Sequence, residues 1–393
     1  ALVLGLALAA IVVRWSMHRE ARRRLARWAR LGGATYGVWL ALSGISGMLL
    51  MLSLINGEAT IGDDGTEFSV VEQAIAFTAI ALWSLVPGVI LTYHGISASM
   101  GEGSSDARAT LAALAVAAFA GIVLLGHWNM SSDEPVAAPM PLLHLLAAAL
   151  PGIALVAMAA RGSPWRGSAV RGVSWRQLML AAAISMSVAT TIAVYVESVG
   201  AVYTIVLMLV HHGAFADAAT GSEVMEIIFE DADWILSEHE QFAANLIVAA
   251  VLAPVSEELA KSLSVRFTMA PNATRAQCFL LGAAAGAAFG FLEALLYGLA
   301  GIQEGLDGWW EIMLVRGGST SLHVICTGLA GLGWWYWTRA RRHRLALALF
   351  AGAMLIHASW NAVFTAIDAR IFVLDTISNR TLEIVAYATV AVV

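Results

Sequence analysis

The stretch Pro254-Val-Ser-Glu-Glu-Leu-Ala-Lys261 places two adjacent carboxylates and a lysine inside a run that otherwise has the composition of a membrane helix. On a helix, Lys261 lies four residues from Glu257 and three from Glu258, so its ammonium group can reach either carboxylate. Each charge at membrane depth costs at least about 2.5–3.5 kcal/mol. A simple interhelical ion pair with Lys261 needs one carboxylate, so the second one indicates a functional site.

The overall composition indicates a membrane protein. The chain has 393 residues, of which 59% are hydrophobic and 13% are charged, whereas a soluble domain is about 25% charged. We therefore expect an all-α fold, a polytopic membrane bundle of about 10–11 transmembrane helices. The chain starts without a methionine and stops in an apolar run, so we expect flanking segments to be missing. Cys278 and Cys326 fall at different depths of such a bundle, which predicts free thiols.

Apolar runs of spanning length divide the chain into three parts. Residues 1–212 carry no assignable motif and contain runs at about 34–55, 70–92, 109–128, 141–160 and 177–212. Residues 213–240 are acidic and extracytoplasmic in the expected topology, and they could hold an amphipathic helix at the membrane surface. Residues 241–393 form the expected catalytic core, with spans at about 245–270, 277–300, 317–338, 345–365 and from about 385.

Alternating basic and acidic loops set the expected orientation. When the arginine-rich stretch 14–30 is placed inside and residues 177–212 cross once, 19 of the 22 Lys and Arg residues fall inside. A hairpin broken near Gly200 would instead put the acidic segment inside and the basic loop Arg339–Arg344 outside. We therefore expect a single crossing, a plasma-membrane location and cytoplasmic basic loops.

The later spans carry polar side chains that share one depth. Counted along their helices, they lie roughly 18–24 Å above the inner membrane face, in the outer half of the bilayer; they are Glu293, His323, His357 and Asn361. Glu257 and Glu258 join this depth only if their helix starts near Leu252, which a break at Pro254 would allow. A helix that started at Gln241 would leave both glutamates near the cytoplasmic face.

Two other features have plainer explanations. His211 and His212 end the long 177–212 run, where we expect interfacial histidines rather than metal ligands. Gly282, Gly286 and Gly290 repeat every four residues, which lets helices approach closely. We expect this face to pack against a neighbouring helix of the same protein; the alternative is a face that accepts a substrate helix beside Glu293.

Four short motifs together resemble the PrsW family of intramembrane proteases, which is grouped with the CAAX prenyl endopeptidases and bacteriocin-processing membrane proteases. The motifs cover about residues 250–365: Glu257-Glu258-x-x-Lys261, Phe289-x-x-x-Glu293, His323 and His357-x-x-x-Asn361. The wider group is expected to show Glu-Glu-x-x-x-Arg and Phe-x-x-x-His, so Lys261 and Glu293 favour the PrsW branch. The resemblance implies site-1-type cleavage of a membrane-anchored substrate, such as an anti-sigma factor, on its extracytoplasmic side.

Two arrangements of these residues could hydrolyse a peptide. In the first, Zn²⁺ is bound by His323, His357 and a carboxylate, either Glu293, which we favour, or one of the Glu257–Glu258 pair. A remaining glutamate, Glu257 or Glu258, then acts as the general base. In the second there is no metal, a glutamate assisted by histidine activates water, and Asn361 with His357 holds the oxyanion. We favour zinc because the resemblance implies a metalloprotease, and we count Lys261 among the catalytic residues.

A proton-coupled membrane transporter is the alternative function, because transporters also place carboxylates and histidines at depth. We see no pair of matching half-sequences with broken helices, which argues against it. An inert scaffold is disfavoured because every motif position is filled. We expect a protein substrate and the lipid bilayer as partners, and no nucleic acid.

Overall fold

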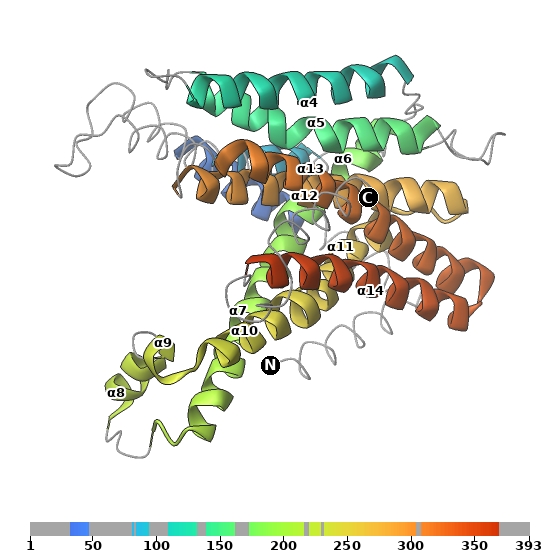
Figure 1. Cartoon of the computed structure of the whole chain (residues 1–393). Coiled ribbons are helices and arrows are strands. Elements are labelled where there is room, and N and C mark those ends of the chain that lie inside the picture. The colour runs from blue at the N-terminus through green and yellow to red at the C-terminus, as the bar shows by residue number, and fades with distance from the viewer. Residues whose placement is uncertain are drawn as a thin grey trace.

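In the computed structural model, every regular element of the described residues is a helix (Figure 1). The structure describes residues 32–46, 81, 84–93, 109–131, 139–161, 173–215, 220–228, 232–303 and 308–368. The expected basic stretch 14–30 and the expected span from about 385 lie outside these residues. The expected runs at 34–55 and 70–92 are described only in part, as helical residues 32–46 and 84–93.

Six helices of the described residues are long and apolar enough to cross a membrane, which confirms the expected all-α, multi-pass fold. They are Leu111–Asn129, Met140–Ala160, Trp175–His211, Glu238–Thr268, Arg275–Gly298 and His343–Ile367. The helix Gly308–Trp335, at the position of the expected 317–338 span, has the length but is not among the six. Its many Gly, Ser and Thr residues dilute its apolar side chains.

The labelled elements follow one another in this order: α4 (Ala109–Met130), α5 (Met140–Arg161), α6 (Trp175–Ile184), α7 (Thr190–His211), α8 (Gly221–Glu226), α9 (Ala232–Ile235), α10 (Glu238–Ile247), α11 (Ala253–Thr268), α12 (Arg275–Gln303), α13 (Gly308–Trp335) and α14 (His343–Asp368). In Figure 1, α4 and α5 form one layer and α12 and α13 lie beneath it. Helices α11 and α14 lie on the other side of α12 and α13.

Helix α12 is the centre of the bundle. In its most apolar stretch, 78% is buried inside the molecule, compared with 17% for α14. It packs against α5, α6, α11 and α13. A helix buried on nearly all sides needs small residues to let its neighbours approach, and the α12 sequence is accordingly rich in alanine and glycine.

The glycine repeat of α12 is the surface on which α13 packs. A methyl group on Gly286 would overlap the carbonyl oxygen of His323, and one on Gly282 would overlap that of Thr327. At Gly290 an added methyl would lie 2.9 Å from the Cα atom of Thr320. The expected packing within the protein is therefore confirmed. The alternative substrate-binding face is wrong, because α13 already occupies this surface.

Residues 175–211 form one continuous helix, in which a π-helical turn, Ser185–Ala189, joins α6 to α7. Its 37 residues span about 55 Å, compared with about 30 Å for the hydrocarbon core of a bilayer. The hairpin broken near Gly200 is therefore wrong, and one continuous helix agrees with the expected single crossing. Gly200 does not break the helix; it lets the Leu252 side chain pack against the α7 backbone.

Residues 238–268 also form one helix, and Pro254 does not interrupt it. A π-helical turn, Val248–Leu252, joins α10 to α11, and the Ala253 N–H donates to the carbonyl of Val248, five residues back. A helix beginning as early as Glu238 was expected to separate the glutamates from the histidines. That expectation is wrong because the additional helical turns belong to α10, which lies beside α7 and away from α12 and α13. Glu257 and Glu258 therefore still lie close to the histidines.

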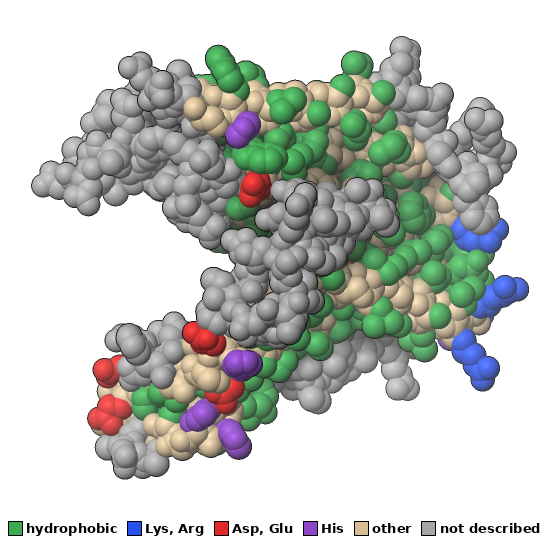
Figure 2. Space-filling view, in the orientation of Figure 1, with side chains coloured by type: hydrophobic (Ala, Val, Ile, Leu, Met, Phe, Trp, Pro, Cys, Tyr) green, Lys and Arg blue, Asp and Glu red, His purple; other side chains and the backbone are tan. Residues whose placement is uncertain are grey.

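The ends of α7 and α10 carry a small lobe formed by residues of the acidic segment, at the lower left of Figure 1. Its apolar side chains gather around the buried Leu209, Ala232 and Leu236. The Nε2 atom of His212 lies 2.7 Å from Oε1 of Glu240, which ties α7 to α10. Figure 2 shows acidic and histidine side chains on this lobe, and Lys and Arg side chains at the opposite end of the molecule.

Candidate active site

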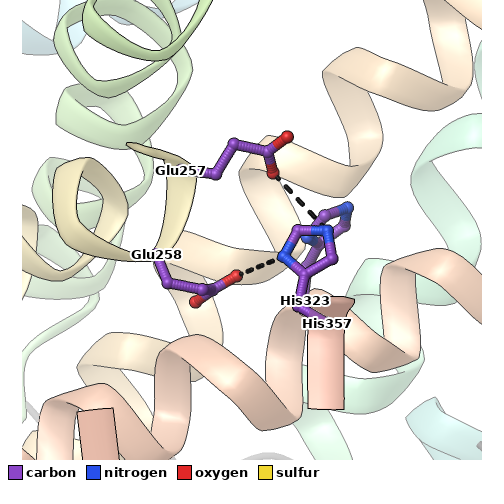
Figure 3. Close-up of side chains that lie close together, drawn as sticks. All are labelled: Glu257, Glu258, His323 and His357. Carbon is purple, nitrogen blue, oxygen red and sulfur yellow. Dashed lines mark hydrogen bonds and ion pairs between the residues drawn. The ribbon is translucent and has the colours of Figure 1, made fainter. Parts of the chain in front are cut away.

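Side chains from α11, α13 and α14 meet in one buried group (Figure 3). Glu257 and Glu258 come from α11, His323 from α13 and His357 from α14, and each offers a possible ligand atom within 4.8 Å of the others. All four side chains are buried. Sequence positions up to 100 residues apart therefore form a single polar site inside an apolar bundle, and for these four residues the expected convergence is confirmed.

Lys261 lies in the same group and is completely buried. Its Nζ atom is 2.6 Å from Glu258 Oε1, 2.8 Å from His323 Nδ1 and 3.1 Å from Glu257 Oε2. The face of the Phe289 ring lies 4.3 Å away and adds a cation–π contact. Lys261 thus neutralises part of the charge of both carboxylates.

Glu258 is held on both carboxylate oxygens. The Thr327 hydroxyl donates to Oε2 at 3.0 Å, and His357 Nδ1 lies 3.0 Å from Oε1. Glu257 is held more loosely: Lys261 binds its Oε2, His357 Nε2 is 3.8 Å away, and its side chain retains 6% exposure. Neighbouring positions of one helix turn therefore give one fixed carboxylate and one less restrained carboxylate.

Glu293 lies beside the group but is not part of it. Its Oε2 atom is 2.6 Å from His323 Nε2, on the side of the ring away from Lys261, and it also pairs with the guanidinium of Arg316. A carboxylate in this position fixes the orientation and tautomer of an imidazole. The sequence predicted Glu293 as a metal ligand, whereas in the structure its carboxylate contacts His323 and is not among the four side chains with converging ligand atoms.

Asn361 was expected to hold an oxyanion, but its side chain is engaged elsewhere. Its Nδ2 atom donates to the carbonyl oxygen of Ala249 at 2.8 Å. In the π-helical register of residues 248–252, residue 254 would donate to this oxygen, but a proline has no N–H. Asn361 therefore satisfies a carbonyl that Pro254 leaves without a partner, and it fastens α14 to the motif helix.

One acidic residue near the site was missed by sequence reasoning. Glu197 of α7 accepts a hydrogen bond from the Ser256 hydroxyl at 2.9 Å, and it lies within electrostatic range of Lys261 and Glu293. The signal was present, because Glu197 is a carboxylate in the middle of a long apolar run. It was overlooked because it belongs to none of the motifs.

The other histidines that the structure describes and both cysteines lie outside the group. His211 and His212 are exposed at the end of α7, as expected for interfacial histidines. His144 is buried, but Trp309 donates to its Nδ1 and its Nε2 bonds the Leu295 carbonyl, so it serves packing. Cys278 and Cys326 are free and buried, which confirms that neither forms a disulfide.

The four-residue group suits a divalent transition metal. Two carboxylates and two imidazoles supply the oxygen and nitrogen donors that such ions bind in enzymes. Two negative charges also balance a dication, which removes the cost of leaving a carboxylate unpaired in the interior. Within the described residues, this is the one group of three or more such side chains with ligand atoms close enough together.

Comparison with known protein families matches residues 173–393 to the PrsW family intramembrane metalloproteases. Neither the curated proteins nor the solved structures gave a significant match. The family match covers more than half of the chain and includes all residues of the buried group. It supports proteolysis and gives no support to transport. The chain therefore belongs to the PrsW family of intramembrane metalloproteases, as its four motifs indicated.

Proposed function

We propose that the protein is an endopeptidase that cleaves membrane-anchored proteins near the extracytoplasmic surface of the cell membrane. The observation that carries this proposal is the buried convergence of Glu257, Glu258, Lys261, His323 and His357 within helices of membrane-spanning length. Peptide hydrolysis needs a base for water, positive charge or donors for the oxyanion, and a proton donor for the leaving amine. These five side chains include candidates for all three tasks.

Glu257 is the proposed general base. Its contacts with Lys261 and His357 are both made by Oε2, and its side chain is the more exposed of the two glutamates. Glu257 takes a proton from water as the water oxygen attacks the peptide carbonyl carbon. When the C–N bond breaks, Glu257 passes this proton to the leaving amine.

Zn²⁺ is the proposed metal, with Glu258, His323 and His357 as its ligands. These three side chains fit the donor preferences of a zinc site, and Glu257 stays available as the base. When bound, zinc supplies a Lewis acid that polarises the peptide carbonyl and stabilises negative charge on its oxygen. Thr327 holds Glu258 and Glu293 holds His323, so both ligands are oriented by the protein itself.

The proposed substrate is a protein with a single membrane anchor, and an anti-sigma factor is the type that the family resemblance suggests. The proposed topology places the basic loop Arg339–Arg344 in the cytoplasm and the acidic lobe outside. The charge separation in Figure 2 supports this orientation, since positively charged loops favour the cytoplasmic side. The active site would then open towards the outer half of the bilayer.

The test is cleavage of a single-pass reporter by the protein and its variants in a membrane. Glu257→Gln and His357→Ala should abolish cleavage while the protein still inserts and purifies normally. Glu226→Gln and His211→Ala are matched controls, because both side chains are exposed and lie outside the buried group; they should cleave normally. Undiminished cleavage by both site variants would refute the proposal.

A further inference from the structure

Lys261 lies between the side chains that are proposed to hold the metal. Its ammonium nitrogen contacts Glu258 Oε1, His323 Nδ1 and Glu257 Oε2 at 2.6–3.1 Å. An ammonium group has three donors, and here three acceptor atoms meet it. The side chain has no exposed surface.

A metal ion at this group would need the same acceptor atoms. Zinc binds carboxylate oxygen and imidazole nitrogen through the lone pairs that now accept hydrogen bonds from Lys261. The two cations would also repel each other strongly in a buried setting. The ammonium group and the metal therefore exclude each other, and only one of them can occupy the centre of the group at a time.

We propose that Lys261 sets the metal affinity of the group by acting as an internal competitor that the metal must displace. This inference rests on the proposed metal site. Without metal, Lys261 prevents two carboxylates from being buried unpaired, which keeps the three helices together. With metal bound, the two carboxylates balance a dication, which accounts for a second glutamate in the motif.

A displaced Lys261 side chain has acidic neighbours that can receive it. Glu293 and Glu197 both lie within electrostatic range of its ammonium group. Glu293 already shares its charge with Arg316, so Glu197 is the neighbour with the fewer positive partners among the described residues. Glu197 is therefore the proposed partner of the ammonium group once the metal has displaced it.

The test measures zinc binding to the full chain in lipid nanodiscs, by competition with a chelator of known affinity. Lys261→Met should bind zinc at least about tenfold more tightly than the unaltered protein, because the competing cation is gone. Zinc should also raise its thermal midpoint by more than it raises that of the unaltered protein. His357→Ala in the Lys261→Met background should abolish this binding, which locates it at the group.

A second variant covers the case in which Lys261→Met does not fold without metal. Glu257→Gln with Lys261→Met removes one negative and one positive charge together and leaves Glu258, His323 and His357 as ligands. It too should bind zinc more tightly than Glu257→Gln alone. Neither readout depends on proteolysis, so the result does not rely on an active enzyme.

The outcomes separate this inference from the proposed function. The inference would be overturned if the unaltered protein and Lys261→Met bind zinc equally tightly. If His357→Ala still abolishes that binding, the proposed metal site stands. Zinc binding that does not depend on His357 in any variant would overturn both the metal site and the inference. If Lys261→Met loses cleavage but binds zinc more tightly, as expected, the result would support the inference.

Discussion

The side-chain amide of Asn361 in α14 donates a hydrogen bond to the carbonyl oxygen of Ala249, 2.8 Å away in the π-helical turn before α11. The turn and the missing N–H of Pro254 together leave this carbonyl without a helical partner. The contact therefore joins two of the three helices that carry the buried group. Pro254 leaves the Ala249 carbonyl in need of a donor, and Asn361 supplies it.

The first prediction tests this link with a double-mutant cycle. Asn361→Ala should lower the free energy of unfolding by about 1–3 kcal/mol, because it leaves the part-buried Ala249 carbonyl without this partner. In a Pro254→Ala background residue 254 can donate to Ala249, so the same change should cost less, with a coupling of about 0.5–3 kcal/mol. Thermal unfolding in detergent measures both costs. Equal costs in the two backgrounds would show that Pro254 does not create the need for this hydrogen bond.

The second prediction concerns Glu293, which contacts His323 from behind. Glu293→Ala should lower the cleavage rate about 10–100-fold, because His323 loses its orientation, while bound zinc is retained. Glu293→Gln keeps an acceptor for His323 and should lose less activity. His323→Ala is the comparison and should lose both metal and activity. If Glu293→Ala removes zinc as completely as His323→Ala, Glu293 is a ligand after all.

The third prediction separates the charge of Glu197 from its hydrogen bond. Glu197→Gln keeps an acceptor for the Ser256 hydroxyl but removes the charge near Lys261. Ser256→Ala removes the bond and keeps the charge. We expect Glu197→Gln to slow cleavage about tenfold, or about 1.4 kcal/mol in activation free energy, and Ser256→Ala to change it little. The reverse order would show that the hydrogen bond matters and the charge does not.

The fourth prediction concerns the close approach of α12 and α13. Gly286→Ala places a methyl group against the His323 carbonyl, so it should destabilise the protein by about 1–3 kcal/mol or more and lower activity. Gly352→Ala in α14 is the control, because nothing lies within 4 Å of the added methyl. It should be neutral or stabilise the helix by up to about 1 kcal/mol. Equal stability of the two variants would refute close packing at Gly286.

The fifth prediction tests the orientation in the membrane. Both native cysteines are fully buried, so new surface cysteines can be labelled with little background. Ser222→Cys in the lobe should react with a membrane-impermeant maleimide on intact cells, and Arg342→Cys in the basic loop should react only after permeabilisation. Both positions are exposed. The opposite pattern would place the basic loop outside.

Several features followed from the sequence because they depend on local rules. Apolar runs predicted the helices, since a backbone in lipid must satisfy its own hydrogen bonds. The four-residue spacing of the glycines predicted a close helix contact, and the structure has it between α12 and α13. Charges inside apolar runs indicated the candidate site residues, since burying a charge without a purpose is costly.

The sequence by itself predicted the apolar helices and placed Glu257, Glu258, His323 and His357 at one depth; only the tertiary structure decided what each side chain touches. The sequence assigned Glu293 to the metal, but the packing of α12 on α13 places it behind His323. It assigned Asn361 to an oxyanion, but a carbonyl on another helix takes its amide. It could not show Lys261 between the proposed ligands. Such contacts join residues far apart in the chain, and spacing along one helix carries no information about them.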